Sequence, residues 1–552
     1  MDYIRTRLKM FNTLGSTNRF TISAFTLICV CFMYTSIVLG VPDNKKVEVE
    51  KQQAEERVLD ASNRAVTQHT LTTADKTLEY FATAASLTIT DKEAKPVSRI
   101  FYISYTADEQ HDYPRPVTFV FNGGPGAASA YLHMGALGPK RVEFSDDGKV
   151  LHMPARLLDN SKSWLSFTDL VFVDPVGTGY SREIKDDTEN NKGRKLRPSK
   201  EKSIGKYAWG VVEDTDSLAR FIRTYLTKEE RWLSPIFLAG ESYGGFRVAR
   251  LSKLLQSDFG IVPSGLVLIS PAIDFGLLWG SERSLWPWVA LLPSYTAVAA
   301  FHERSDMITY KADNPRVSLG EVERFALSEY LTGLAGGDLL PDWIEQSSNM
   351  MGLHADILHR WAGRVPPARF AKALLSDQRR LVSLYDGSIK LVDSDPARQM
   401  LAGGDPYLDR LNAPVTAAFN TYVRDHLDFK TELPYLLLNE EVFKSWNWWS
   451  GIQGQQGFAE AVADLKQAMC INPHMQVLII HGVFDLVTPY YATWITIKQM
   501  DLDPEISDNI QFKVYHGGHM PYLHRRSLDS MFKDATQFFT STMRLPEHVD
   551  PD

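Results

Sequence analysis

Residues 235–244 read Pro235-Ile236-Phe237-Leu238-Ala239-Gly240-Glu241-Ser242-Tyr243-Gly244, an apolar run that ends in a glycine-flanked serine. The run predicts a buried strand, and a helix-like pattern follows from Phe246 to Leu255. Strand, G-x-S-x-G and helix in this order predict a sharp turn that lifts the Ser242 hydroxyl clear of a sheet. The flanking positions must be glycine because so sharp a turn leaves no room for side chains. We therefore expect Ser242 to be a nucleophile, with the next helix N-terminus aimed at the oxyanion its attack creates.

The composition is that of a globular protein. The chain has 552 residues, of which 44% are hydrophobic, and can bury a large core. Its net charge of −8 offers no support for a nucleic-acid partner. Core signals lie both before residue 275 and after residue 475, which favours one large α/β core with an insertion over several separate domains.

The N-terminus has the pattern of a targeting segment. Four basic residues precede an almost charge-free apolar stretch from Phe20 to Leu39, and a polar run follows. Residues 1–40 are predicted to be a cleaved signal peptide, so the protein would be exported to a periplasm or secreted. The alternative is an uncleaved anchor formed by residues 20–39, the one membrane contact we expect. Residues 41–79 are polar and are predicted to be a tether.

Runs of strand length recur along the chain. Two alternating runs, Leu87–Thr90 and Ile100–Tyr105, predict a leading antiparallel hairpin. Helical patterns such as Tyr207–Tyr225 separate the later runs, and this alternation predicts a mostly parallel sheet with helices on both faces, an α/β fold. The core strands are expected at Val117–Phe121, Leu170–Val173, Ile236–Ala239, Leu266–Ser270, Val477–His481 and Phe512–Tyr515.

The middle of the chain is predicted to be an insertion. Residues 276–430 hold helical patterns, several prolines and few strand-like runs. We expect them to form a helical cap between the two parts of the core, residues 80–275 and 431–552. The polar residues 183–203 are predicted to be a mobile surface loop.

The strands after the insertion carry partners for the serine. Asp485 follows the strand Val477–His481, and His519 follows Phe512–Tyr515 in a glycine-rich loop. The carboxyl ends of parallel strands meet at one edge of a sheet, where ligand sites form. The order Ser, Asp, His is that of α/β-hydrolases. We therefore expect Asp485 and His519 to form a triad with Ser242.

These residues also have structural interpretations. An Asp after a strand is commonly a turn residue or helix cap. His516, His519 and His524 together suggest a metal cluster, but no acidic or Cys partner stands at a metal-like spacing. No metal and no cofactor is therefore expected. His516 is interpreted as a neighbour of the base, because Gly517-Gly518 supplies a bend directly before His519.

A glycine-rich segment supplies candidate oxyanion donors. The sequence Phe121-Asn122-Gly123-Gly124-Pro125-Gly126 directly follows the strand Val117–Val120. Bare glycines let backbone N–H groups approach a carbonyl oxygen, as an oxyanion hole requires. The structural alternative is a plain turn between a strand and a loop. Because the chain also carries the serine motif, this alternative is the weaker interpretation.

These motifs together resemble the serine carboxypeptidase family (S10), peptidases of the α/β-hydrolase fold. The resemblance runs from about residue 80 to about residue 545, with the motifs in the family's order. The matching pieces are Asn122-Gly123-Gly124-Pro125-Gly126, Asp174-Pro175-Val176-Gly177-Thr178-Gly179-Tyr180-Ser181, Gly240-Glu241-Ser242-Tyr243-Gly244, the loop with Asp485, and Gly518-His519-Met520-Pro521.

The resemblance implies a peptidase that acts on peptides with a free C-terminus. It implies a triad of Ser242, Asp485 and His519, and an oxyanion hole made by the N–H groups of Gly124 and Tyr243. Asn122 and Glu241 would hold the terminal carboxylate of the substrate, and Gly123 would also contact the substrate.

Glu241 has a physical reason for this role. Burial beside the nucleophile should raise its pKa, and only a protonated Glu241 can donate a hydrogen bond to a carboxylate. We therefore expect activity under acidic conditions. The alternative is that Glu241 merely fills the second position of the serine motif.

The chain departs from the family at Ala136. Family members usually carry a second carboxylate-binding Glu shortly before Leu-Gly-Pro, where this chain has Ala136-Leu137-Gly138-Pro139. One hydrogen bond to a charged group contributes about 1.5–3 kcal/mol, so its absence could weaken exopeptidase specificity roughly tenfold to a hundredfold. A serine esterase or acyltransferase with the same triad therefore remains the alternative function, and a binding protein on a retired hydrolase fold is a third. The sequence indicates no oligomeric state.

Overall fold

The structure is a computed structural model that describes residues 64–73, 76–109, 114–184, 208–281, 283–337, 339–450 and 457–543. All of them fall within one compact unit, Glu56–Asp552. The predicted targeting segment 1–40 and most of the predicted loop 183–203 lie outside the described residues. Among the described residues, no helix combines the length and apolar character needed to cross a membrane.

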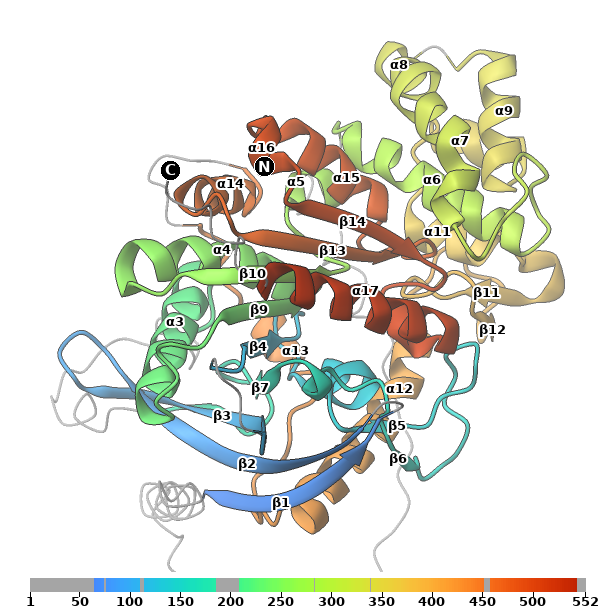
Figure 1. Cartoon of the computed structure of the whole chain (residues 1–552). Helices are drawn as coiled ribbons and strands as arrows, with labels where there is room; N and C mark the ends of the chain where they lie inside the picture. Colours follow the sequence, from blue (N-terminus) through green and yellow to red (C-terminus); the bar gives the residue numbers. More distant parts are fainter. Residues whose placement is uncertain are drawn as a thin grey trace, which may run out of the picture. The chain divides into compact units, whose positions relative to one another are not determined.

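A twisted sheet forms the centre of this unit, and six of its strands are parallel (Figure 1). Its order is β1-β2-β3-β7-β4-β9-β10-β13-β14, and the two-residue β8 (Arg182–Glu183) pairs with β3. The parallel strands are β7 (Asp169–Val173), β4 (Val117–Phe121), β9 (Ile236–Glu241), β10 (Pro263–Ile269), β13 (Gln476–Gly482) and β14 (Ile510–Tyr515). The predicted α/β fold with a mostly parallel sheet is confirmed.

The first three strands are antiparallel and extend the sheet on one side. They are β1 (Ala65–Thr72), β2 (Thr77–Thr90) and β3 (Pro96–Ala107). The predicted hairpin is confirmed, although both of its strands are longer than expected. The predicted tether 41–79 is wrong over β1 and the start of β2. β1 is an edge strand whose side chains are mostly polar and only partly covered, so its alternation produces no apolar signal.

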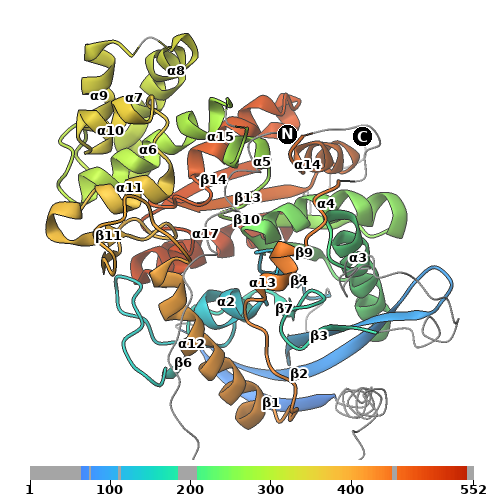
Figure 2. The same ribbon diagram turned by 180° about the vertical axis from the view of Figure 1, so that it is seen from behind.

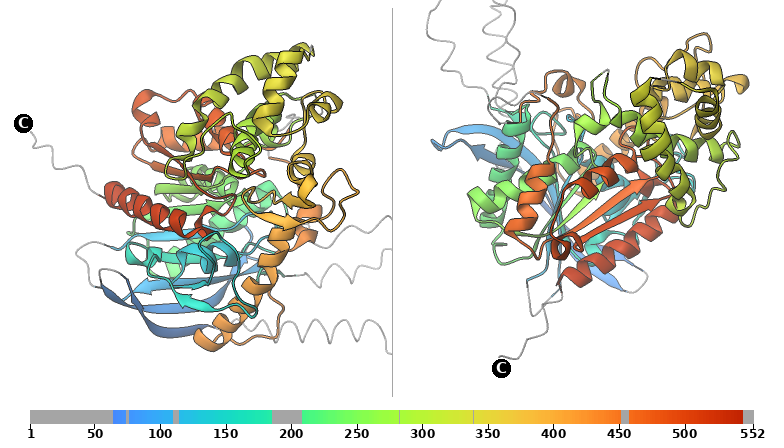
Figure 3. Two further views of the ribbon diagram at one scale, coloured as in Figure 1. Left: turned by 90° about the vertical axis from the view of Figure 1, so that its right-hand side faces the viewer. Right: turned by 90° about the horizontal axis from the view of Figure 1, so that it is seen from above.

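Helices cover both faces of the sheet because the central strands are apolar on both sides. Along β9, Ile236 and Leu238 pack in one apolar cluster with α3 (Val211–Lys228), α4 (Tyr243–Phe259) and α14 (Val462–Ile471). Phe237 and Ala239 point to the opposite cluster, with α17 (Arg525–Met543). Figures 1 and 3 show α17 on one side of the sheet and α3 and α4 on the other. β9 is thereby fixed in register, with Ser242 directly after its end.

The insertion lies between β10 and β13 and is mostly helical, as predicted. Its helices α6 to α11, within Trp286–Ala373, form an apolar cluster of their own that also includes α15 (Tyr490–Gln499). They form the lobe at the upper left of Figure 2. The helix α12 (Pro406–Thr421) packs instead against the cluster that contains α17. The insertion also holds a small antiparallel hairpin, β11 (Arg380–Val382) and β12 (Lys390–Val392).

Candidate active site

Ser242 stands on a strained turn between β9 and α4. Its φ of 60° and ψ of −124° lie in a region that residues other than glycine rarely adopt. A Cβ on Gly240 would lie 2.1 Å from the carbonyl oxygen of Gly244, and a Cβ on Gly244 would lie 2.4 Å from that of Phe121. Side chains are therefore sterically excluded at both flanking positions, as the sequence predicted.

Asp485 and His519 form a buried pair at the carboxyl edge of the sheet. The Nδ1 atom of His519 lies 2.8 Å from Oδ2 of Asp485. The other oxygen of Asp485 accepts backbone N–H bonds from Val487 (2.8 Å) and Thr488 (2.9 Å). The Thr488 hydroxyl lies 2.7 Å from Oδ2 of Asp485 and 3.0 Å from Nδ1 of His519. Both oxygens of the carboxylate therefore have hydrogen-bond partners, and the carboxylate binds the imidazole through Nδ1.

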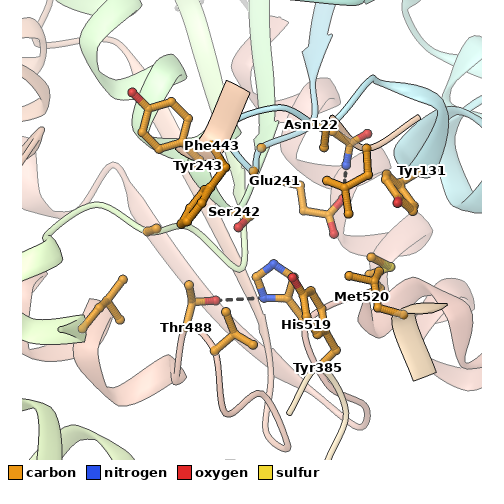
Figure 4. A pocket seen from close by; sticks show the side chains of 18 of the residues that line it. Asn122, Tyr131, Glu241, Ser242, Tyr243, Tyr385, Phe443, Thr488, His519 and Met520 are labelled. Atoms are coloured by element: carbon orange, nitrogen blue, oxygen red, sulfur yellow. Dashed lines mark hydrogen bonds between the residues drawn. The ribbon is translucent and has the colours of Figure 1, made fainter. Parts of the chain in front are cut away.

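The surroundings of His519 make it a stronger base than a free imidazole. Burial alone would lower its pKa, but the charge and hydrogen bond of Asp485 more than offset that effect, so the pKa lies above 6.5. Figure 4 shows the ring of His519 between the Ser242 hydroxyl and Thr488. This is the order in which a serine, an imidazole and a carboxylate act in acyl transfer.

The predicted oxyanion donors come together beside Ser242. Tyr243 is the first residue of α4, so its N–H has no partner within the helix. A Cβ on Gly123 would lie only 2.5 Å from the Tyr243 nitrogen, so the glycine loop and the helix start are in close contact. Gly124 has a φ of +98°, which glycine adopts without strain. Both segments line the same pocket as Ser242.

Glu241 and Asn122 form a buried polar pair in that pocket. Oε2 of Glu241 accepts hydrogen bonds from Asn122 Nδ2 (2.5 Å) and from the Tyr522 hydroxyl (2.8 Å). Its other oxygen, Oε1, is buried and has no hydrogen-bond partner among the described residues. Burial raises the pKa of Glu241 to about 7, against the opposing effects of His519, Tyr522 and Asn122. A carboxyl group that is protonated near neutral pH and has one free oxygen can donate to an anionic ligand.

Arg247 ties the glycine loop to α4. Its Nη1 donates to the Asn122 carbonyl oxygen at 2.5 Å, and its Nε donates to Asp214 of α3 at 2.6 Å. The guanidinium also lies 4.9 Å from the centre of the Tyr243 ring. Because Arg247 is 1% exposed, water cannot replace these contacts. The residues before Gly124 are thereby held against the helix that carries Tyr243.

The pocket has a volume of about 280 Å³ and two chemically different ends. In Figure 4, Asn122, Glu241, Tyr131 and Met520 lie on one side of Ser242, and Tyr243 and Phe443 lie on the other. The second end continues into an aromatic wall, in which Trp448 packs against Phe443, Phe275 and Trp279. Glu241 is the one acidic side chain in the pocket lining.

The site residues that were predicted from the sequence lie together around one pocket. Asn122, Gly123, Gly124, Glu241, Ser242, Tyr243 and His519 all line it, and Asp485 lies behind His519. Sequence reasoning missed Thr488, Tyr522, Arg247 and Tyr385. Tyr522 stands three residues after His519, which could have drawn attention to it. The others carry no motif.

The remaining candidates lie elsewhere. His516 is 2.7 Å from the Tyr310 hydroxyl, and burial lowers its pKa to about 4. His524 pairs with Asp386 at 2.7 Å. Ala136 is buried in a π-helical turn, His133–Leu137, and does not line the pocket. Within the described ranges, no three His, Cys, Asp or Glu side chains are placed to hold a metal ion.

Comparison with known proteins agrees with this geometry. The family model "Serine carboxypeptidase" matches residues 87–259, a stretch that contains both the glycine loop and the serine turn. This part of the chain is similar to the serine carboxypeptidase family. Asp485 and His519 lie outside the stretch matched to this family, so their place in the site rests on the structure.

Two curated relatives show how limited the sequence similarity is. Pheromone-processing carboxypeptidase KEX1 of Fusarium vanettenii is 27% identical over 228 residues, which cover 41% of this chain and 31% of the relative. Serine carboxypeptidase-like 51 of Arabidopsis thaliana is 28% identical over 202 residues, 34% of this chain and 38% of the relative. The chain thus matches less than two fifths of the length of either.

Among solved structures, the crystal structure of VinJ covers 83% of this chain and 99% of its own length, with 11% identity and a TM-score of 0.33. The fold assignment therefore rests on the sheet topology of this chain itself.

Proposed function

We propose that this protein is a serine carboxypeptidase that removes C-terminal residues from peptides through an acyl-enzyme. The observation that carries the proposal is the position of Glu241. A buried carboxyl with a pKa of about 7 and one unpartnered oxygen stands next to the nucleophile. Such a group suits the terminal carboxylate of a peptide, and a simple ester would leave it unused.

The chemistry follows from the residues of the site. Ser242 attacks the carbonyl carbon of the last peptide bond while His519 takes the hydroxyl proton. The N–H groups of Gly124 and Tyr243 stabilise the oxyanion. His519 then gives the proton to the leaving amine, which departs as a free amino acid. Water, activated by His519, releases the shortened peptide and restores Ser242.

The two ends of the pocket suggest how the substrate lies. The terminal carboxylate would accept hydrogen bonds from protonated Glu241 and from Asn122, which fixes the distance from the chain end to Ser242. The C-terminal side chain would then face Tyr131 and Met520. The preceding residue would lie on the other side of Ser242, along Phe443 and Trp279. Because that end is aromatic, we expect an apolar residue to be preferred there.

The missing second Glu at Ala136 does not leave Glu241 without support. Tyr522 and Asn122 both donate to its Oε2, so we expect the ligand to be bound by Oε1, which is buried and has no partner among the described residues. This arrangement supports carboxylate recognition with a single acidic residue. We expect recognition to be weaker than with two, since one charged hydrogen bond contributes about 1.5–3 kcal/mol.

The test compares three substrates that differ only at the C-terminus. A blocked dipeptide with an apolar penultimate residue is offered as the free acid, as the amide and as the methyl ester at several pH values from 5 to 8, because His519 must be unprotonated to act as the base. The proposal predicts that kcat/KM for the free acid exceeds that for the amide by at least about tenfold. Hydrolysis of the ester alone would establish the esterase alternative instead. A wild-type protein that cleaves none of the three would refute both enzymatic functions.

We also propose export, on the basis of the basic flank and apolar stretch before residue 40. N-terminal sequencing of the protein from its native host tests this. A mature chain that begins shortly after residue 40 is expected, whereas an intact chain in the membrane fraction would favour the anchor formed by residues 20–39.

A further inference from the structure

A short segment of the insertion crosses the loop that carries Asp485. The segment is Leu384–Gly387, in the turn between β11 and β12, and it is called the strap below. The N–H of Leu486 donates to the carbonyl oxygen of Leu384 (3.0 Å), and the N–H of Gly387 donates to that of Phe484 (2.9 Å). These two bonds involve the residues on either side of Asp485. The strap therefore fixes the backbone from which the acid projects.

The same strap also contacts the loop that carries His519. The N–H of His519 donates to the carbonyl oxygen of Tyr385 at 2.5 Å. The ring of Tyr385 lies edge-on to the imidazole, with centroids 5.2 Å apart and an interplanar angle of 87°. A Cβ on Gly518 would lie 2.1 Å from the Tyr385 oxygen, so the two backbones are in contact and leave no room for a side chain at position 518. Figure 4 shows Tyr385 beside His519.

A buried contact between Asp386 and His524 anchors the strap to the segment that follows His519. Oδ2 of Asp386 lies 2.7 Å from Nε2 of His524. The two side chains are 4% and 3% exposed. Oδ1 of Asp386 accepts hydrogen bonds from the backbone N–H (3.0 Å) and the hydroxyl (2.6 Å) of Ser388. Neither Asp386 nor His524 lines the pocket, so their contact with the site runs through the strap and through the loop that carries His519.

We propose that the strap positions both the acid and the base of the triad, and that Asp386 and His524 are positioning residues for His519. This inference rests on the proposed hydrolase chemistry. The parallel strands β13 and β14 bring the two loops to one edge, where the N–H of Phe484 donates to the carbonyl oxygen of Gly517 (2.9 Å), and the strap bonds to both loops. A displacement of His519 by about 1 Å is expected to cost about 100-fold in rate, so anchoring this loop has a direct catalytic effect.

The test replaces His524 in two ways. His524→Leu removes the partner of Asp386, whereas His524→Gln retains an amide that can donate to it. For His524→Leu we expect kcat to fall about 10- to 100-fold with KM for the peptide within about threefold of wild type, because Asn122 and Glu241 are untouched. His524→Gln should recover at least half of that loss on a logarithmic scale. The rate of Ser242 modification by a fluorophosphonate should follow the same order.

A matched control separates positioning from mere stability. Lys372 and Asp393 form a buried ion pair beside the same hairpin, with side chains 4% exposed each, and neither lines the pocket. Asp386→Asn and Asp393→Asn each replace one buried acid by its amide. All assays are run at least 10 °C below each variant's Tm. Asp386→Asn is expected to lower kcat at least fivefold more than Asp393→Asn.

Two results would overturn the inference. One is a His524→Leu protein with kcat within threefold of wild type. The other is an equal loss of kcat in Asp386→Asn and Asp393→Asn, and this comparison decides the matter if His524→Leu does not fold. The wild-type protein is the reference in both, so inactivity of the wild type would refute the proposed function and not the positioning role alone.

Discussion

The Tyr522 hydroxyl donates a hydrogen bond of 2.8 Å to Oε2 of Glu241. Asn122 donates to the same oxygen, so Oε1 is left without a partner in the pocket. This asymmetry has a chemical consequence. We expect the proton of neutral Glu241 to reside on Oε1, the buried oxygen that accepts no hydrogen bond among the described residues, and to be donated to a substrate carboxylate.

Glu241 should determine the pH dependence for substrates with a free C-terminus. Its pKa is about 7, so it is protonated in acid, and above pH 7 its charge repels a carboxylate. The kcat/KM ratio of free-acid to amide substrate should fall as the pH rises from 6 to 9. Taking the ratio cancels the titration of His519, which both substrates share. In Glu241→Gln the ratio should be constant with pH, and a wild-type ratio that rises over this range would contradict the account.

The same group should affect stability. The pKa of Glu241 in the folded protein, about 7, lies above the value of about 4.3 expected in an unfolded chain. The folded state therefore binds the proton more tightly. This contribution to stability is complete below about pH 4 and is lost as the pH rises through 7. Glu241→Gln lacks this contribution. The Tm of the variant minus the Tm of the wild type should therefore increase as the pH is raised from 5 to 8. A difference in Tm that is independent of pH would show that Glu241 does not titrate in this range.

Arg247 should be required for the geometry of the oxyanion hole. Arg247→Met removes the bond to the Asn122 carbonyl and leaves Asp214 buried without its partner. Breaking one side of a buried pair costs about 3–5 kcal/mol. Combining Arg247→Met with Asp214→Leu removes the unpaired charge. The double variant should regain most of the lost Tm, yet kcat should remain about 100-fold below wild type. Full recovery of kcat would assign Arg247 a purely structural role.

Phe443 should contribute to selectivity for the residue before the cleaved bond. Its side chain is 45% exposed and lines the pocket, whereas Trp449 is 49% exposed and does not. Phe443→Ala should lower kcat/KM for a penultimate Phe substrate about 10-fold relative to a penultimate Ala substrate, from the loss of apolar contact. Trp449→Ala should leave this preference within about twofold. Equal effects of the two substitutions would argue against a subsite at Phe443.

The central strands could be predicted from the sequence because they are apolar on both faces. β4 has the bounds expected, and β7 differs by one residue. Ser242, Asp485 and His519 could be predicted because each lies in the turn or loop that follows a predicted strand. β1 could not, since an edge strand with polar side chains on both faces has no apolar period.

The residues that hold the site in place could not be predicted, for a different reason. The strap acts through backbone atoms of Leu384, Tyr385 and Gly387, which lie far along the chain from the two loops that they bind. Backbone hydrogen bonds leave no signature in side-chain patterns. Arg247 had a weaker signal. A charged residue in a helix must have a partner when it is buried, but the sequence does not identify that partner as Asp214, and α4 carries two further basic residues, Arg250 and Lys253.

Hydrolysis at this site requires above all that Ser242 be a nucleophile activated by His519. The direct measurement is the mass of the intact protein after treatment with a fluorophosphonate, followed by peptide mapping of the adduct. We predict a single adduct on Ser242 in the wild type, none in Ser242→Ala, and labelling slowed by at least about 1000-fold in His519→Ala. Undiminished labelling of Ser242→Ala, or labelling of His519→Ala at the wild-type rate, would contradict the account.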